Sequence, residues 1–172
     1  MTTISLTADD VLAALRAFVI VHLPAGVEVI AAQDNGVAMP AAPFVAMTLV
    51  DARRLTTNFT KYTDGAPGNK ALAMPTQITV QLDFYGPDSG AWAAIVAALF
   101  RDDVAYAAFP AAIKPLYADD PVQLPLIDGE QQFEQRWKLN AVMQTVPVVT
   151  VEQESATDLA PGVIEVDAAY PP

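Results

Sequence analysis

The chain has 172 residues, of which 53% are hydrophobic and only 17% are charged, and its 20 acidic and 9 basic residues give a formal net charge of −11. This length fits one domain with a core of its own, and the apolar excess favours surface that is reserved for a protein partner. The charge argues against nucleic-acid binding, which depends on neutralising phosphates with Lys and Arg, and against an anionic membrane surface.

The sequence contains no signal for export. There is no cysteine, which excludes disulfides and thiolate metal sites, and residues 1–10 lack the basic start of a secretory signal. The apolar run 11–23 contains Arg16 and is shorter than the roughly 20 residues that a membrane-spanning helix needs. We therefore expect a protein that is made and used in the cytoplasm, without a membrane partner.

The first predicted element is a helix that begins after Thr7 and ends near Leu23. Thr7 is a favourable N-cap, and acids follow in the first turn, where they suit the positive end of the helix dipole. Pro24 disfavours helical geometry in the residue before it. Apolar residues recur at helical spacing, at Val11, Leu12, Leu15, Phe18 and Val19. Because residues 18–21 are apolar on all sides, we expect them to be buried on more than one face.

Three strands are predicted next. A short one covers 27–32 and is closed by the turn Asp34-Asn35-Gly36, and one over 44–52 is apolar on both faces, as in a central strand. The clearest alternation covers 77–85, where Ile78, Val80, Leu82 and Phe84 share one face. Residues 55–74 interrupt this pattern and are predicted to form a long excursion, either a loop or a hairpin.

A second helix is predicted after Gly86-Pro87, with Asp88 or Ser89 as its cap. Its core-facing stripe consists of Trp92, Ile95, Val96, Leu99 and Phe100. The opposite side consists almost wholly of alanine, at Ala93, Ala94, Ala97 and Ala98. A bare alanine face indicates close packing against another surface, so Ala93, Ala94 and Ala97 are candidate subunit contacts.

The last third of the chain is predicted to contain one strand and an acidic end. A proline-rich crossing, with prolines at 110, 115, 121 and 125, leads to an alternating strand over 132–145. We interpret 155–172 as an acidic C-terminal segment, in which Val163, Ile164 and Val166 favour a further strand or an arm. Helix, strands, helix and strands in this order predict a single α+β domain over 1–154, with a mainly antiparallel β-sheet, two principal helices packed on one face and a polar opposite face.

No pattern in the chain predicts catalysis. His22 has apolar neighbours and is interpreted as a packed histidine, and adjacent acids such as Asp9-Asp10 point about 100° apart on a helix, so they do not converge on a substrate. The pair Asp119-Asp120 precedes a proline and predicts a turn. The glycine-rich loop 65–70 lacks the GxxxxGK[ST] phosphate-binding pattern, and no His, Cys or acid cluster has metal-ligand spacing. We predict no enzyme, no catalytic residue, no cofactor and no metal site.

Two charged groups are candidate contacts. Arg53, Arg54 and Lys61 are the only dense basic group. They are either solvated charges at a strand end or a surface for an acidic neighbour such as a second copy of this chain; contact with DNA is a third, less favoured alternative. Asp102 and Asp103 lie at the end of the second predicted helix, where the dipole disfavours acids, and a basic partner would account for them.

The order of these pieces resembles the neck or tail-terminator family of long-tailed phages and prophages. The features that carry the resemblance are the opening helix, the strand 44–54, the strand that ends in Asp83-Phe84-Tyr85-Gly86 with the Trp92 helix after it, the stretch Glu134-Gln135-Arg136-Trp137, and the closing Val166-Asp167-Ala168-Ala169-Tyr170-Pro171-Pro172. Together they cover most of the chain.

This resemblance implies an α+β subunit that closes into a ring, with six subunits as the expected number, on top of a completed tail tube. Such a virion protein, assembled in the host cytoplasm, would contact itself, the tail tube protein and a head–tail connector or adaptor. DNA would pass through its lumen without specific binding.

Three alternatives remain at this point. The nearest is a head-completion or neck adaptor of the same virion. A different class is a small-molecule-binding domain or enzyme, with a pocket beneath the proline-rich crossing, and a third is a protein-interaction module unrelated to phage.

Overall fold

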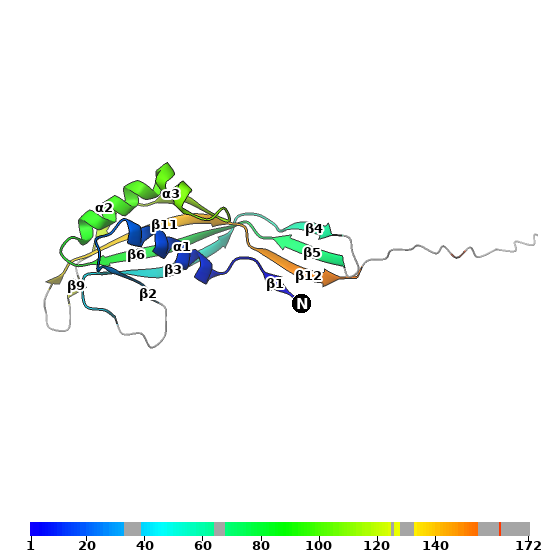
Figure 1. Ribbon diagram of the computed structural model, residues 1–172, viewed down its shortest axis with the longest axis horizontal. Helices are drawn as coiled ribbons and strands as arrows, with labels where there is room; N and C mark the ends of the chain where they lie inside the picture. The colour runs from blue at the N-terminus through cyan, green and yellow to red at the C-terminus, as the bar shows by residue number, and fades with distance from the viewer. Residues whose placement is uncertain (33–38, 64–67, 125, 128–132, 155–161, 163–172) are drawn as a thin grey trace, which may run out of the picture.

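Two β-sheets of different character lie end to end in the computed structural model, which describes residues 1–32, 39–63, 68–124, 126–127, 133–154 and 162. The larger sheet and the helices form the part that we call the body, and the smaller sheet forms the arm, which projects from one end of the body (Figure 1). The chain is therefore elongated along the direction of its long strands.

The body contains the helices and the long strands. Its elements are α1 (Ala8–Val21), β2 (Glu28–Ala31), β3 (Phe44–Arg54), β6 (Thr76–Tyr85), α2 (Ser89–Phe100), α3 (Asp103–Ala108), β7 (Ile113–Ala118), β8 (Val122–Gln123) and β11 (Arg136–Thr145). The arm consists of β1 (Thr3–Ile4), β4 (Phe59–Thr63), β5 (Gly68–Ala73) and β12 (Val148–Gln153), and a short hairpin is made by β9 (Leu126–Ile127) and β10 (Phe133–Glu134).

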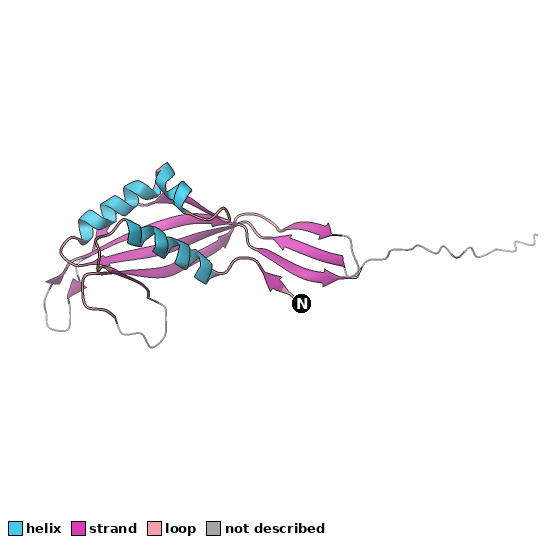
Figure 2. Ribbon diagram, viewed as in Figure 1, coloured by secondary structure: helices cyan, strands magenta, loops and turns pink. Residues whose placement is uncertain are grey.

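The body sheet has the strand order β2-β3-β6-β11-β7, with β8 beside β11. Only β2 and β3 pair in parallel; the other pairs are antiparallel. The helices cover one face of this sheet (Figure 2). A continuous core joins α1 and α2 to the inward residues of β6, as the alternation predicted, with Leu15, Val96, Val80 and Leu82 all buried in it. The predicted α+β class with helices on one face is confirmed.

Helix α1 begins as predicted. Thr7 is the N-cap, and with Asp10 it forms a capping box: the backbone N–H of Asp10 donates to the Thr7 hydroxyl, and the backbone N–H of Thr7 donates to the Asp10 carboxylate at 2.8 Å. The prediction that residues 18–21 are buried on more than one face is wrong. Phe18 and Val19 are buried, but Val21 is 76% exposed, because only one side of the helix meets the sheet.

Helix α2 is rotated about its own axis relative to the prediction, so that a different set of its side chains faces the core. Ala93 and Ala97 are buried beside Trp92 and Val96 in the core, whereas Ile95 is 44% exposed. The expected alanine face is therefore wrong for Ala93 and Ala97, whose side chains are used inside the chain. A helix with almost no polar residue has no marked amphipathic signal, so the sequence could not fix which side faces inward.

Helix α3 was not predicted, and it explains Asp102 and Asp103. Asp102 is the N-cap of α3, and the backbone N–H of Val104 donates to its carboxylate at 3.2 Å. The two acids therefore begin a helix instead of ending one. At a helix start they suit the dipole, so no external basic partner is needed to account for them.

Two further segments differ from the sequence-based expectation. The proline-rich crossing contains β7, an edge strand in which Pro115 sits opposite Met143 beside a bulge; an edge strand tolerates proline because it needs no second hydrogen-bonding side. Residues 148–153, where no strand was predicted, form β12. The turn expected at 34–36 and the strand expected around 163–166 lie outside the described residues.

The arm continues the three central strands of the body. Along the chain β3 leads into β4, β5 into β6, and β11 into β12, and the arm keeps the same lateral order, β1-β12-β5-β4. Between body and arm is a narrow junction, which we call the waist, where the N–H of Leu55 donates to the carbonyl of Pro75 at 3.0 Å and the N–H of Met74 to the carbonyl of Pro147 at 2.9 Å. The excursion 55–74 is thus a β-hairpin.

The helix-free face of the body sheet carries a buried polar cluster. Asp83 is 4% exposed and forms an ion pair with Arg136, with 2.9 Å between the guanidinium and the carboxylate; the Gln81 amide donates to the other carboxylate oxygen at 2.7 Å. Next to them, the rings of Phe44 and Tyr85 stack with centroids 4.4 Å apart. This face is therefore polar as predicted along its middle, but it has an apolar patch at one end.

Candidate assembly surfaces

The arm sheet has two chemically different faces, which follow from its strand register. Residues paired across strands share a face, so Thr3, Thr150, Ala71 and Lys61 lie on one face, together with Glu152 two residues along β12. We call this the charged face of the arm. The opposite face, which we call the apolar face of the arm, carries Ile4, Val149, Leu72, Val151 and Tyr62, with Lys70 as its charged residue beside Tyr62.

Neither face of the arm is covered by the described part of the chain. No hydrophobic side chain of β1, β4, β5 or β12 belongs to the buried core. Every residue of β4 is exposed, and the rings of Phe59 and Tyr62 are 61% and 60% exposed. A small sheet gains stability by burying one apolar face, and exposed aromatic side chains on a regular element are typical of a surface that meets a partner.

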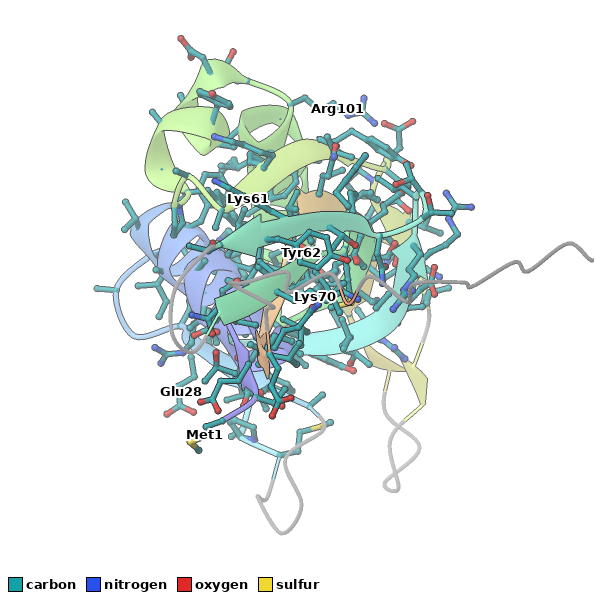
Figure 3. All side chains as sticks on the ribbon, turned by 90° about the vertical axis from the view of Figure 1, so that its right-hand side faces the viewer. Met1, Glu28, Lys61, Tyr62, Lys70 and Arg101 are labelled. Carbon is teal, nitrogen blue, oxygen red and sulfur yellow. The ribbon has the colours of Figure 1, made fainter. Side chains whose placement is uncertain are left out.

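The basic candidates lie where the arm leaves the body. Arg53 and Arg54 end β3, and Lys61 lies in β4. The Arg53 guanidinium donates to the Gln77 side-chain oxygen at 3.1 Å, and that of Arg54 donates to the Asn58 side-chain oxygen at 3.2 Å. Within the described residues none of the three forms an ion pair. Figure 3, viewed from the arm end, shows Lys61 on the β4 side of the arm sheet and Met1 on the opposite side.

The acidic candidates lie in the helix layer. Asp102 and Asp103 are exposed at the start of α3, and the part of one copy that is described shows no ion pair between them and Arg53, Arg54 or Lys61. A hydrogen bond from the Asp103 side chain, together with that from the Val104 N–H, lowers the pKa of Asp102. The same side-chain contact and the charge of Asp102 raise the pKa of Asp103. As contacts with a second copy they stay a prediction, as do Ala94 on the exposed side of α2 and the three basic residues.

The carboxylate that sequence reasoning missed is Glu152. It lies in β12 on the charged face of the arm, where its carboxylate pairs with the amino group of Met1, which lowers the pKa of Glu152. The run of β-branched residues from Val148 to Val151 was the available signal for a strand. The last of the strands predicted for the domain ended at residue 145, so Glu152 was not placed on a strand.

The rest of the described surface carries few groups that could bind a ligand or catalyse a reaction. An open groove of about 420 Å³ lies between α1 and β2, away from the proline-rich crossing where a ligand pocket was expected under the small-molecule alternative. Its charged side chains are Asp9 and Arg16, and the Arg16 guanidinium donates to the Val29 carbonyl at 2.8 Å.

Among the described residues no three His, Cys, Asp or Glu side chains gather as metal ligands. The described helices are too short or too polar to cross a membrane.

His22 is placed as predicted. It caps the C-terminal end of α1, is half-buried, and its ring meets that of Phe18 edge-on with centroids 4.8 Å apart. An imidazole used in this way is a packing group.

Comparison with known proteins agrees with this architecture. The chain is similar to a cryo-EM structure of the sheath/tube terminator of the PVC extracellular contractile injection system in its extended state, with a TM-score of 0.55 and 13% sequence identity. The match covers 96% of this chain and 66% of that one, so this chain spans about two thirds of that protein. At this identity the likeness shows the fold.

Sequence comparison gives the family. No curated protein sequence matches the chain. The family model described as phage neck terminator protein matches residues 9–167, which include α1 except its first residue, α2 and α3, and the arm strands β4, β5 and β12. The chain belongs to the phage neck terminator protein family.

Proposed function

We propose that copies of this protein form a ring on the head-proximal end of a completed tail, where the ring ends tube growth and presents the surface that the head joins. The observation that carries the proposal is the arm: a regular sheet on a terminator-family subunit whose two faces are both left uncovered by the described chain. A subunit of this kind covers its exposed sheet by assembling with other subunits.

The proposed role is structural, and it implies which proteins this chain contacts. The ring consists of copies of this chain, six by the expectation of the family, and it contacts the tail tube protein on one side and a head–tail connector on the other. The net charge of −11 supports a lumen that lets DNA pass without binding it, because like charges repel. The protein is then a virion component that is assembled in the host cytoplasm.

Deletion of the gene from a phage or prophage tests the role directly. We expect electron micrographs to show headless tails of irregular, overgrown length, because nothing stops the addition of tube subunits. Tails of normal length beside full, detached heads would instead identify a head-side adaptor. Intact infectious particles would contradict any role in the virion.

Charge reversal tests the basic candidates. In Arg53→Glu/Arg54→Glu, we expect the protein to be lost from tails while the free energy of unfolding stays within about 0.5 kcal/mol of wild type, as is usual for exposed positions. Lys114→Glu, on β7 at the far edge of the body sheet, is a single charge-reversal control away from the arm and should assemble normally. Normal assembly of the double variant would remove Arg53 and Arg54 from the interface.

A further inference from the structure

The arm sheet ends in two unequal open edges. On one side β4 pairs only with β5, so one row of its backbone N–H and C=O groups meets no described strand. On the other side β1 covers β12 at Thr150 and Val149 only, which leaves the stretch from Val151 to Gln153 without a described strand on that side. Open edges of regular strands are templates for pairing with another chain.

The two edges carry opposite charge on the same face. Lys61 lies on β4, and Glu152 lies on β12 near the other edge; both lie on the charged face of the arm by register. Lys61 is exposed and forms no ion pair with a described carboxylate. The Glu152 carboxylate pairs with the Met1 amino group of its own copy, but the side chain stays 60% exposed and can meet a second cation. If two copies were joined edge to edge, Lys61 of one would meet the acidic edge of the next.

The strand directions are compatible with such a join. β4 and β12 are each antiparallel to β5, so they run parallel to each other, and β1 runs antiparallel to both. A rotation that places a second copy beside the first keeps these directions. The β4 edge of one copy can therefore extend the β1–β12 edge of the next by regular strand pairing. The two edges are different patches, as the head-to-tail contacts of a ring require.

We propose that the β4 edge of one copy pairs with the β1–β12 edge of a second copy, so that the arms form one continuous sheet in which Lys61 faces the second copy's acidic edge around Glu152. This inference rests on the proposed ring and specifies its interface. The partner is a second copy of this chain, because the two edges complement each other in charge and in their unpaired backbone groups.

Engineered disulfides test the join with little background, since the chain has no cysteine. Lys61→Cys/Glu152→Cys places one thiol near each edge of the arm. Within one copy the two positions are separated by two strand spacings, roughly 10 Å or more, which is beyond the Cα–Cα limit of about 7 Å for a disulfide. Any disulfide between these positions must therefore join two copies.

We expect tails from phage carrying this double variant, once oxidised, to give a ladder of covalent multimers of the protein on a non-reducing gel. Tyr62→Cys/Glu152→Cys is the matched control: it uses the same strands, but Tyr62 lies on the other face, so a continuous sheet keeps its thiol away from position 152. No ladder in the first variant on tails of normal length, or equal ladders in both, would overturn the join while the terminator role stands.

A charge swap gives a second readout that does not depend on disulfide geometry. Lys61→Glu and Glu152→Lys should each reduce the amount of the protein on purified tails, because like charges then face each other across the join. The double swap should restore it. Circular dichroism of the free proteins checks that each variant folds. Equal incorporation of all four proteins contradicts the join, whereas normal tails without the gene contradict the terminator role itself.

Discussion

At the scale of single residues, Thr7 and Asp10 show how short-range chemistry fixes a helix start. Each satisfies the other's backbone N–H, and the hydrogen bonds from Thr7 lower the pKa of the Asp10 carboxyl. A folded-state pKa below the unfolded value means that the stabilisation is fully present above the unfolded pKa. It is then lost as the pH falls through the lower, folded value.

Thr7→Ala should therefore lower the free energy of unfolding by about 1 kcal/mol at neutral pH, the usual cost of losing an N-cap side chain. Below the ordinary pKa of aspartate, near 4, the difference from wild type should shrink as Asp10 is protonated. Denaturant unfolding between pH 7 and pH 2.5 measures both effects. Thr2→Ala, an exposed position outside the helices and strands, is the control; a constant difference at all pH values would contradict the coupling.

The element scale is illustrated by Gly90, near the start of α2. A glycine in a helix normally costs stability, but a Cβ added here would lie 2.9 Å from Cε2 and 3.0 Å from Nε1 of the Trp137 indole. The absence of a side chain allows α2 to approach β11 closely, and α2 packs against that strand more than against β6.

Gly90→Ala should consequently destabilise the protein by about 1 kcal/mol. The overpacking of a buried contact costs about 1–3 kcal/mol and outweighs the gain of up to about 1 kcal/mol in helix propensity. Denaturant unfolding, followed by the tryptophan fluorescence, measures it. In a Trp137→Phe background the smaller ring removes the clash, so the same substitution should become neutral or stabilising. Destabilisation of equal size in both backgrounds would contradict this explanation.

The sequence predicted elements whose pattern is local and clear. Alternation identified β6 and β11, and a cap, a first turn of acids and a proline bounded α1. It missed α3, whose six residues are too few to show a period, and β7, because Pro115 is tolerated only at an edge, a tertiary property. The sequence also could not predict which side of α2 faces the core, because a helix rich in alanine has no contrast in polarity between its sides.

At the scale of the whole molecule, the body and the arm should differ in local stability. The central body strands are buried against helices, whereas β4 is exposed throughout and most residues of β5 and β12 are only half-buried. The candidate site residues differed in how far the sequence could predict them. Arg53, Arg54 and Lys61 were selected from the sequence as a group, but Glu152 needed the register of β12 to place it on the same face of the arm as Lys61.

Hydrogen exchange measures this division. In the free protein we expect the amides of β4, β5 and β12 to exchange much faster than those of β6 and β11, because local opening of the arm exposes little apolar surface. On assembled tails the arm amides should become protected, while those of the body change little. Equal exchange in body and arm of the free protein would show that the arm is stable without a partner.

The waist has a mechanical consequence. Three segments of the chain, β3–β4, β5–β6 and β11–β12, pass through it, so a force that acts along the long axis of the molecule runs parallel to the strands. Such a load shears many ladder hydrogen bonds at once, whereas a sideways pull on β4 opens them one after another. The molecule is therefore stiffer along its long axis than against a sideways pull at its β4 edge.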